Sequence, residues 1–399
     1  MASDSISISY PSIYPGAKKT EINFYSGKPD LVKLFFDGDT DGKIDTGAVA
    51  GTPGTADVGK KGTPAPQTSQ KRYFITDANV ASLDCMQDFT AKFEDGVYND
   101  KDYLLVLGSG EKYKTIETLL SIITVAAEAG FTRKDMFVGI GGGVICDITA
   151  FAASIYERGI EVQFVPTTLL AMVDATVGGK TSCDYENSKN IMGTFFTASK
   201  AYYFPEFVQY LPEVQYNSGL AEAFKTALLF DKDLYETFKN EDKKILARDR
   251  PLLEEIIKKC VIAKGKIVEK DFSGENVRAY LSLGHTFGYA LESLAGLGNL
   301  VYGTTVAWGI GRSVELAYKK EYCLQAFKDE VLEILKKYGW ESQAIPPIIQ
   351  GGGVGERLLA VMHKDKKNFS DKIRLVLQKG VEDTLVEEVD DKDILSVLK

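Results

Sequence analysis

The sequence predicts an α/β protein in which a doubly wound parallel sheet is followed by a mainly α-helical domain. Two observations lead to this prediction. Between positions 71 and 166, short β-rich runs alternate with helical patterns, the order that is typical of a parallel sheet covered by helices. From about position 205 onward, long amphipathic segments replace this alternation. We therefore expect one domain over residues 1–204 and a second over residues 205–399.

The elements of the first domain follow in order. A strand within "TEINFYSG" and a short helix within "KPDLVKLFF" precede residues 37–70, which are rich in Gly, Pro, Ser and Thr and predict a surface insertion without a core. The next strands are predicted within "RYFITD", "YLLVLGS", "MFVGIGG" and "VQFVPTT". Helices are predicted within "TIETLLSIITVAAEAG" and "GVICDITAFAASIY".

The second domain is expected to be built from helices and closed by a strand. The helices are predicted within "NSGLAEAFKTALLF", "PLLEEIIKKCVIAKGKIVEK", "RAYLSLGHTFGYALESLAG", "TTVAWGIGRSVELAYKK" and "AFKDEVLEILKKYG". The segment "DKIRLVLQKG" has a β-like pattern.

Composition narrows the class of protein. Of its 399 residues, 47 are basic and 56 are acidic, so the formal net charge is −9. This balance argues against a nucleic-acid binder or a membrane-surface binder, because either would carry a basic surface. No apolar run reaches the ~18 residues of a membrane span, and the start lacks a signal-peptide pattern. The five scattered cysteines indicate reduced thiols, so we expect a cytoplasmic protein.

A glycine turn connects a predicted strand to a predicted helix in the first domain. Gly141, Gly142 and Gly143 stand at this junction. Glycine lets the backbone approach a phosphate, and the first turn of a helix offers free N–H groups to it, as in Rossmann-like domains. The alternative is a tight turn that binds nothing.

Polar residues gather after the last strand of the alternating region. Thr167 and Thr168 stand at its C-terminal end, where open α/β sheets bind ligands. Asp174, Lys180 and then "SKN" follow. Lysines and an amide near glycine turns suit an anionic substrate, whereas the alternative is a set of solvated surface lysines.

Two helices of the second domain carry candidate residues for chemistry. Glu222 and Lys225 are spaced i, i+3, and from this spacing alone we expect an exposed ion pair. In the segment from Arg278 to Tyr289, polar side chains recur on one stripe of the predicted helix, among them His285. From its spacing His285 is either a metal ligand or a histidine satisfied within the fold.

Seven segments, in order and spacing, resemble the 3-dehydroquinate synthase family of sugar phosphate cyclases. They are "GEKYKT", "GGGVICD", "PTTLLAMVDATVGGKT", "KN", "GLAEAFK", "LGHTFGYALE" and "DKK". The resemblance implies that NAD binds in the N-terminal domain and that a divalent metal, zinc or cobalt, and the substrate bind in the helical domain. The implied reaction converts a phosphorylated keto sugar acid, 3-deoxy-D-arabino-heptulosonate 7-phosphate, to 3-dehydroquinate and phosphate, with NAD recycled.

The resemblance also implies residue roles. The residues matched to the NAD site are Asp77, Asn79, Glu111, Lys114, Gly142, Gly143, Asp147, Thr167, Thr168, Asp174, Lys180 and Lys189. The residues matched to the catalytic, anion-binding set are Lys180, Asn190, Lys225, Lys264, Arg278 and Lys366 or its neighbour Lys367. Arg158 matches an arginine that a neighbouring subunit contributes, which implies a homodimer. Glu222 and His285 match two of three metal ligands.

The chain departs from the family pattern around the metal. Tyr302 stands where the family has its third ligand, a histidine, and Ser282, Tyr289 and Cys146 are further changes. A neutral phenol is a poor zinc ligand. Three alternatives remain: Tyr302 ligates as a phenolate, water takes its place, or metal-dependent cyclisation has been lost. His363, the only other histidine, is an additional candidate.

Other functions are compatible with these residues. A related cyclase would take a neutral sugar phosphate, a pseudoenzyme would bind NAD without turnover, and an oxidoreductase of the glycerol dehydrogenase kind would accumulate NADH. A substrate panel distinguishes the two kinds of cyclase, and measurements of NAD binding and of NADH accumulation distinguish the pseudoenzyme and the oxidoreductase.

Overall fold

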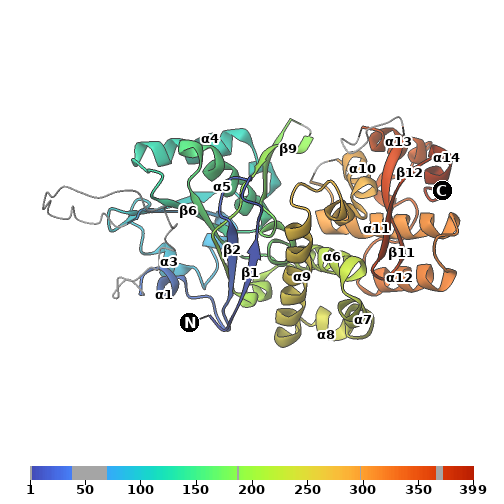
Figure 1. The fold of residues 1–399 in the computed structure, drawn as a ribbon, viewed down its shortest axis with the longest axis horizontal. Coiled ribbons are helices and arrows are strands. Elements are labelled where there is room, and N and C mark those ends of the chain that lie inside the picture. The colour runs from blue at the N-terminus through green and yellow to red at the C-terminus, as the bar shows by residue number, and fades with distance from the viewer. Residues whose placement is uncertain (1, 38–69, 187, 297, 365–371) are drawn as a thin grey trace, which may run out of the picture.

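The computed structural model describes residues 2–37, 70–186, 188–296, 298–364 and 372–399. Figure 1 shows a sheet-containing N-terminal half and a helical C-terminal half, with α6 (Glu213–Phe230) and α9 (Arg250–Lys270) between them. The predicted insertion, apart from its two end residues, lies outside the described residues, and so does Lys366.

The first half is built on a sheet with strand order β1-β2-β10-β7-β6-β3-β5-β4 in the described part of the chain. All neighbours pair in parallel except the edge strands β1 and β4, which run antiparallel to theirs. The strands are β1 (Asp4–Ser9), β2 (Lys19–Phe24), β3 (Arg72–Asp77), β4 (Val97–Tyr98), β5 (Asp102–Leu107), β6 (Met136–Gly141), β7 (Glu161–Pro166) and β10 (Lys200–Tyr203). The doubly wound parallel sheet is confirmed, and β3, β5, β6 and β7 are the strands predicted in the alternating region.

Two helices of this half, α4 (Ile116–Glu128) and α5 (Gly143–Ile155), were expected from the sequence. In α4 the buried Leu119, Ile122 and Ala126 recur at helical spacing, so one face packs inward. In α5 most residues are buried, which fits a helix enclosed by its neighbours. Three short helices accompany them: α1 (Leu31–Phe35), α2 (Ala78–Ala81) and α3 (Gln87–Thr90).

A hairpin that the sequence pattern did not reveal follows the sheet. Strands β8 (Lys180–Tyr185) and β9 (Ser188–Phe195) pair antiparallel, with Lys180 opposite Phe195. Before it, a single π-helical turn spans Ala171–Ala175. The hairpin therefore carries the predicted residues Lys180, Lys189 and Asn190, for which the sequence had indicated no strand.

The second half is mainly helical, as expected. Besides α6 and α9 it contains α7 (Lys232–Asn240), α8 (Asp242–Leu246), α10 (His285–Ala295), α11 (Tyr302–Lys319), α12 (Gln325–Lys337), α13 (Val354–Met362) and α14 (Asp391–Ser396). The β-like segment is strand β11 (Ile373–Gly380), which pairs antiparallel with β12 (Asp383–Val389).

One predicted helix is wrong. The segment expected to run continuously from Arg278 to Tyr289 is a 3-10 helix over Val277–Ser282, and α10 begins only at His285. Gly284 breaks it with φ of +79°, a backbone conformation that favours glycine. A side chain at Gly284 would also meet the carbonyl oxygen of Val306 at 2.5 Å.

Close backbone packing holds α10 against α11. A Cβ atom at Gly309 would lie 2.0 Å from the carbonyl oxygen of Gly284, and one at Gly288 would lie 2.8 Å from that of Thr305. Glycine at these positions lets the two helices approach closely. The approach brings the first residue of α10, His285, near the first residue of α11, Tyr302.

Candidate active site

The glycine turn lies where the strand order of the sheet reverses. Strand β3 lies between β5 and β6, and the carboxyl ends of β3 and β6 meet at the crevice that usually binds ligands in such sheets. Gly141 ends β6 and Gly142 immediately precedes α5. A Cβ atom at Gly142 would lie 3.0 Å from Cγ2 of Thr168, so the turn leaves little room for a side chain. The buried hydroxyl of Thr167 has no hydrogen-bond partner.

Asp77 ends β3 at the same edge of the sheet. Its carboxylate accepts hydrogen bonds from the backbone N–H groups of Asn79 (2.9 Å) and Val80 (3.1 Å) and so caps α2. Both predicted residues, Asp77 and Asn79, therefore lie beside the crevice.

A buried lysine connects the cofactor side to the hairpin. The Nζ atom of Lys114 donates to Asp147 Oδ2 and to Asn190 Oδ1, each at 2.6 Å. Asp147 lies in the second turn of α5, and Ser182 donates a further hydrogen bond to Asn190 Oδ1 at 2.7 Å. Although burial opposes the charge of Lys114, Asp147 and Glu111 raise its pKa. Lys114 therefore stays cationic between two sets of predicted site residues.

Four predicted residues of the helical half converge on one another. Lys225 Nζ lies 2.5 Å from Glu222 Oε2 and 3.3 Å from His285 Nε2. Tyr302 Oη lies 3.1 Å from the same imidazole nitrogen, and Glu222 Oε1 lies 3.5 Å from it. The expected ion pair of Glu222 and Lys225 exists, but the expectation that it is exposed is wrong, because both side chains are 1% exposed. Helix α6 is buried on most of its surface, which spacing could not reveal.

Burial and charge shape the ionisation of this group. Burial favours the neutral form of Glu222, yet the charge of Lys225 and the contact with His285 together outweigh it and lower the pKa of the carboxyl group. Burial raises the pKa of Tyr302 well above its ordinary value, and the neighbouring Tyr289 and Glu222 add to this. The group therefore combines a carboxylate, an ammonium and a neutral phenol around one imidazole.

A second buried ion pair lies close by. Lys264 Nζ, on α9, donates to both the carboxylate and the backbone carbonyl of Asp174, each at 2.6 Å. Burial opposes ionisation of Asp174, but the charges of Lys264, Lys225 and His285 hold its pKa below the usual range. The pair thus connects the π-helical turn of the first half to α9.

Lys189 bridges the two halves. Its Nζ atom lies 2.6 Å from Glu292 Oε1 on α10 and 3.5 Å from Glu111 Oε1. Sequence reasoning singled out Lys189 and Glu111 but missed Glu292. The signal was present, because Glu292 is seven residues after His285 and therefore on the same face of a helix.

Arg278 is buried beside the glycine pair that precedes the hairpin. Its guanidinium donates to the carbonyl oxygens of Gly178, at 2.8 Å, and of Phe272. Burial lowers the pKa of Arg278 to about 10. It lies near the start of β8, where Lys180 is exposed.

Two family models match this chain in succession. The model for the 3-dehydroquinate synthase N-terminal domain matches residues 104–218, and the model for the C-terminal domain matches residues 219–368. The 3-dehydroquinate synthase of Pelobacter propionicus is 34% identical over 81% of this chain and 88% of its own length. That of Dictyoglomus thermophilum is 35% identical over 73% of this chain and 80% of its own length. The chain belongs to the 3-dehydroquinate synthase family.

Solved structures share the fold of this family member. A 2-epi-5-epi-valiolone synthase from Streptomyces hygroscopicus, with NAD+ and Zn2+ bound, has a TM-score of 0.74 at 23% identity and covers 88% of this chain and 98% of its own. A 2-deoxy-scyllo-inosose synthase, complexed with carbaglucose-6-phosphate, NAD+ and Co2+, has a TM-score of 0.78 at 20% identity and covers 99% of both chains. A probable glycerol dehydrogenase from Sinorhizobium meliloti is less similar, with a TM-score of 0.57 at 15% identity over 82% of this chain and 89% of its own.

Glu222, His285 and Tyr302 provide only part of the ligand set that a divalent cation such as zinc prefers. Of the two buried carboxylate oxygens of Glu222, Oε2 is paired with Lys225, whereas Oε1 accepts no hydrogen bond of good geometry and therefore suits a cation. An imidazole nitrogen and a phenol oxygen lie beside them. No group of three or more His, Cys, Asp or Glu side chains that could hold a metal occurs among the described residues. Tyr302 is the reason, because it replaces the expected histidine.

Two predicted residues, Arg158 and His363, lie apart from these contacts. Arg158 is exposed just after α5, and because this helix of 13 residues spans about 20 Å, Arg158 lies far from the glycine turn at its start. His363 Nε2 lies 3.0 Å from Asp391 Oδ1, beside the C-terminal helix. Lys366 lies outside the described residues.

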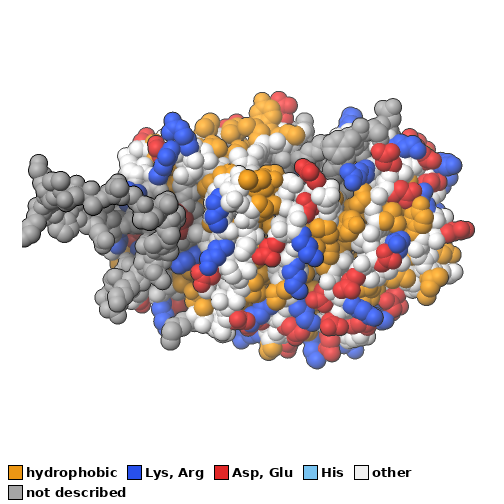
Figure 2. All heavy atoms as spheres, in the orientation of Figure 1, with side chains coloured by type: hydrophobic (Ala, Val, Ile, Leu, Met, Phe, Trp, Pro, Cys, Tyr) orange, Lys and Arg blue, Asp and Glu red, His pale blue; other side chains and the backbone are white. Residues whose placement is uncertain are grey.

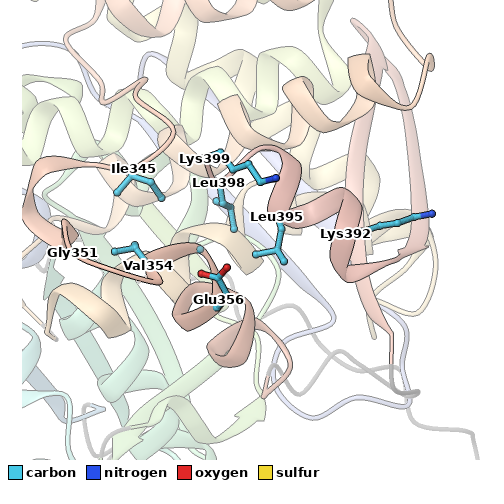
Figure 3. A pocket seen from close by; sticks show the side chains of 9 residues that line it. Ile345, Gly351, Val354, Glu356, Lys392, Leu395, Leu398 and Lys399 are labelled. Carbon is cyan, nitrogen blue, oxygen red and sulfur yellow. The ribbon is translucent and has the colours of Figure 1, made fainter.

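Surface features elsewhere do not add to the site. A hollow of about 460 Å³ lies between α13 and α14, lined by residues such as Glu356, Leu395 and Lys399 (Figure 3), and shares no residue with the predicted site. Basic and acidic side chains are interspersed over the face shown in Figure 2. None of the helices in the described ranges is long and apolar enough to cross a membrane.

Proposed function

We propose that this chain is a 3-dehydroquinate synthase. It would convert 3-deoxy-D-arabino-heptulosonate 7-phosphate to 3-dehydroquinate and phosphate, as a carbon–oxygen lyase that recycles NAD and uses a divalent metal. The observation that carries the proposal is the convergence of buried lysines with Glu222 and His285, in a chain one-third identical to 3-dehydroquinate synthases over most of its length. A substrate with both a carboxylate and a phosphate needs several cations within one cleft.

The cofactor site is proposed at the crevice beside the glycine turn. The N–H groups at the start of α5 would bind the pyrophosphate of NAD, and Gly142 and Gly143 let the backbone approach it. The remaining members of this site are Asp77, Asn79, Glu111, Lys114, Asp147, Thr167, Thr168, Asp174, Lys180 and Lys189. When bound, NAD would accept and return a hydride, and the metal would polarise the oxygen of the hydroxyl group that is oxidised.

The substrate would lie between the two halves. Lys225 and Lys264 are buried ammonium groups whose partners, Glu222 and Asp174, fix their positions. Together with Lys180, Asn190, Arg278 and Lys366 they would bind the carboxylate and phosphate and orient the ring. Such positioned charges act where negative charge develops during elimination of phosphate.

Glu222 and His285 would hold the metal, zinc or cobalt, with Tyr302 in the third position. The support is the buried Oε1 atom of Glu222, which accepts no hydrogen bond of good geometry and lies 3.5 Å from the imidazole nitrogen. The neutral phenol makes this set weaker for zinc than one with two histidines.

The enzyme is further proposed to be a cytoplasmic homodimer. Arg158 is exposed just after the C-terminal end of α5, far from the glycine turn at the start of that helix. From this position it would reach the site of a second subunit rather than that of its own chain. All five cysteines are free thiols, which fits a reducing compartment.

Phosphate release from 3-deoxy-D-arabino-heptulosonate 7-phosphate tests the proposal directly. The assay contains NAD with zinc or cobalt, a chelator control, and a neutral heptulose phosphate as competing substrate. Release that needs both NAD and metal, without accumulation of NADH, is the expected result. Release from the neutral substrate alone would instead identify a related sugar phosphate cyclase. If a folded protein that binds NAD releases phosphate from neither substrate, it is a pseudoenzyme.

A further inference from the structure

One buried carboxylate of the helical half contacts the cofactor side of the protein. Glu292 has a side chain that is 3% exposed, and its Oε1 atom lies 2.6 Å from Lys189 Nζ. Glu292 belongs to α10, whereas Lys189 belongs to β9, which Figure 1 shows on the side of the first half that faces α10. A short, partly buried, charge-assisted contact of this kind constrains both elements that it joins.

The helix that carries Glu292 also carries His285. The two residues are seven positions apart in α10, so they lie two turns apart on one face. At one end of this face His285 contacts Lys225 and Tyr302. At the other end Glu292 holds Lys189. A shift of α10 would therefore move both contacts together.

Lys189 is followed by a residue that is fixed in an unusual conformation. Asn190 has φ of +53°, and its backbone N–H donates to Asp184 Oδ1 at 2.7 Å. Its side chain accepts from Lys114, which in turn is paired with Asp147 near the glycine turn. A chain of polar contacts therefore connects the start of β9, through Asn190, Lys114 and Asp147, to the second turn of α5.

Glu292 and Glu111 are both carboxylate partners of Lys189, and Glu292 is the closer one. Burial disfavours the charge of Lys189, but Glu111 and Glu292 raise its pKa and keep it cationic. Glu111 is 40% exposed and lies 3.5 Å away, so it is the weaker partner. Without Glu292, the ammonium would be drawn toward Glu111 and solvent.

We propose that Glu292 is a positioning residue that holds Lys189 in place for the cofactor and registers α10 against the hairpin. This inference rests on the proposed function, because Lys189 belongs to the proposed NAD site. Glu292 acts through Lys189 and does not itself touch a ligand.

The test compares Glu292→Gln and Glu292→Asp with the native chain. The control is Asp102→Asn. Asp102 is also a buried carboxylate, and it pairs with Arg72 at 2.7 Å. This pair lies at the N-terminal ends of β3 and β5, away from the carboxyl ends of the strands where the NAD site is proposed. The dissociation constant for NAD is measured by calorimetry without substrate, and the melting temperature is measured in parallel. We expect Glu292→Gln to weaken NAD binding about tenfold, the scale of one hydrogen bond to a charged group, with Glu292→Asp closer to native. Asp102→Asn should lower the melting temperature without changing NAD affinity.

A double-mutant cycle tests whether the effect passes through Lys189. In a Lys189→Met background, Glu292→Gln should change NAD affinity less than about twofold, because the contact is already lost. An equal loss in both backgrounds would overturn the inference. So would an unchanged NAD affinity in Glu292→Gln accompanied by a lower melting temperature. If the native enzyme binds NAD but releases no phosphate, the proposed function fails, while these NAD affinities still decide the role of Glu292.

Discussion

Lys225 Nζ lies 2.5 Å from Glu222 Oε2, and both side chains are almost fully buried within α6. Two charges removed from water require each other, because either one alone would be strongly disfavoured. The same ammonium lies 3.3 Å from His285 Nε2, so it is already close to the proposed metal ligands. Lys225 therefore contributes to stability as well as to the positive charge beside His285.

Replacing Lys225 with methionine should destabilise the protein by roughly 3–5 kcal/mol, because it leaves Glu222 buried and unpaired. The control is Lys239→Met, which breaks a partly exposed, solvent-screened pair with Glu330 and should cost far less. Unfolding in urea measures both. Similar small losses for the two variants would contradict the assignment of Lys225 as the counter-ion of a buried carboxylate.

Tyr302→His should strengthen zinc binding by about 10–100-fold, because it supplies a conventional third ligand beside His285. Competition with a chelator measures the affinity without any assay of turnover. Tyr302→Phe is the informative control. If it binds zinc as the native chain does, the phenol does not ligate. If it binds zinc more weakly, Tyr302 is itself a ligand.

Gly142→Val should weaken NAD binding at least about tenfold, because its side chain would meet Thr168 and block approach to the start of α5. The matched control is Gly352→Val, since a Cβ at Gly352 has no heavy atom within 4 Å. Calorimetric titration with NAD compares the two. Equal affinities would exclude the glycine turn as the pyrophosphate site.

Asp271→Asn should reduce stability by about 1–3 kcal/mol at neutral pH. The Asp271 carboxylate accepts hydrogen bonds from four backbone N–H groups, including that of Arg278. Burial raises its pKa, but these hydrogen bonds outweigh burial and lower it overall. The stabilisation is therefore present above the unfolded-state pKa of about 3.9 and is lost as the pH falls through the lower folded-state pKa.

Melting temperatures at several pH values test this dependence. The difference between the native chain and Asp271→Asn should be constant above about pH 5 and should shrink as the pH falls below about 4. A difference that persists unchanged into strong acid would show that the carboxylate charge does not hold this loop.

The sequence was most informative where local pattern and tertiary structure agree. Strands β3, β5, β6 and β7 and helices α4 and α5 could be predicted, because buried strands and amphipathic helices have distinct spacing. The hairpin of β8 and β9 could not, because its polar residues lack alternation. The break at Gly284 also escaped prediction, since the contact that requires it comes from α11, which lies later in the sequence.

The candidate site shows a similar limit. Motif resemblance identified Glu222, Lys225 and His285, and the structure brings these residues together. Spacing suggested that the ion pair of Glu222 and Lys225 is exposed, because spacing within one helix carries no information about what covers it. Glu292 was missed for the same reason, since its partner Lys189 is 103 residues away in the sequence.

The close glycine contacts between α10 and α11 have an evolutionary consequence. They fix the backbone of both helices independently of the side chain at position 302, so the third donor can change without rebuilding the fold. Codons for tyrosine and histidine differ by a single base. A lineage with this helix pair can therefore move between a phenol and an imidazole in one mutational step, which makes the metal preference of the proposed site easier to alter than its architecture.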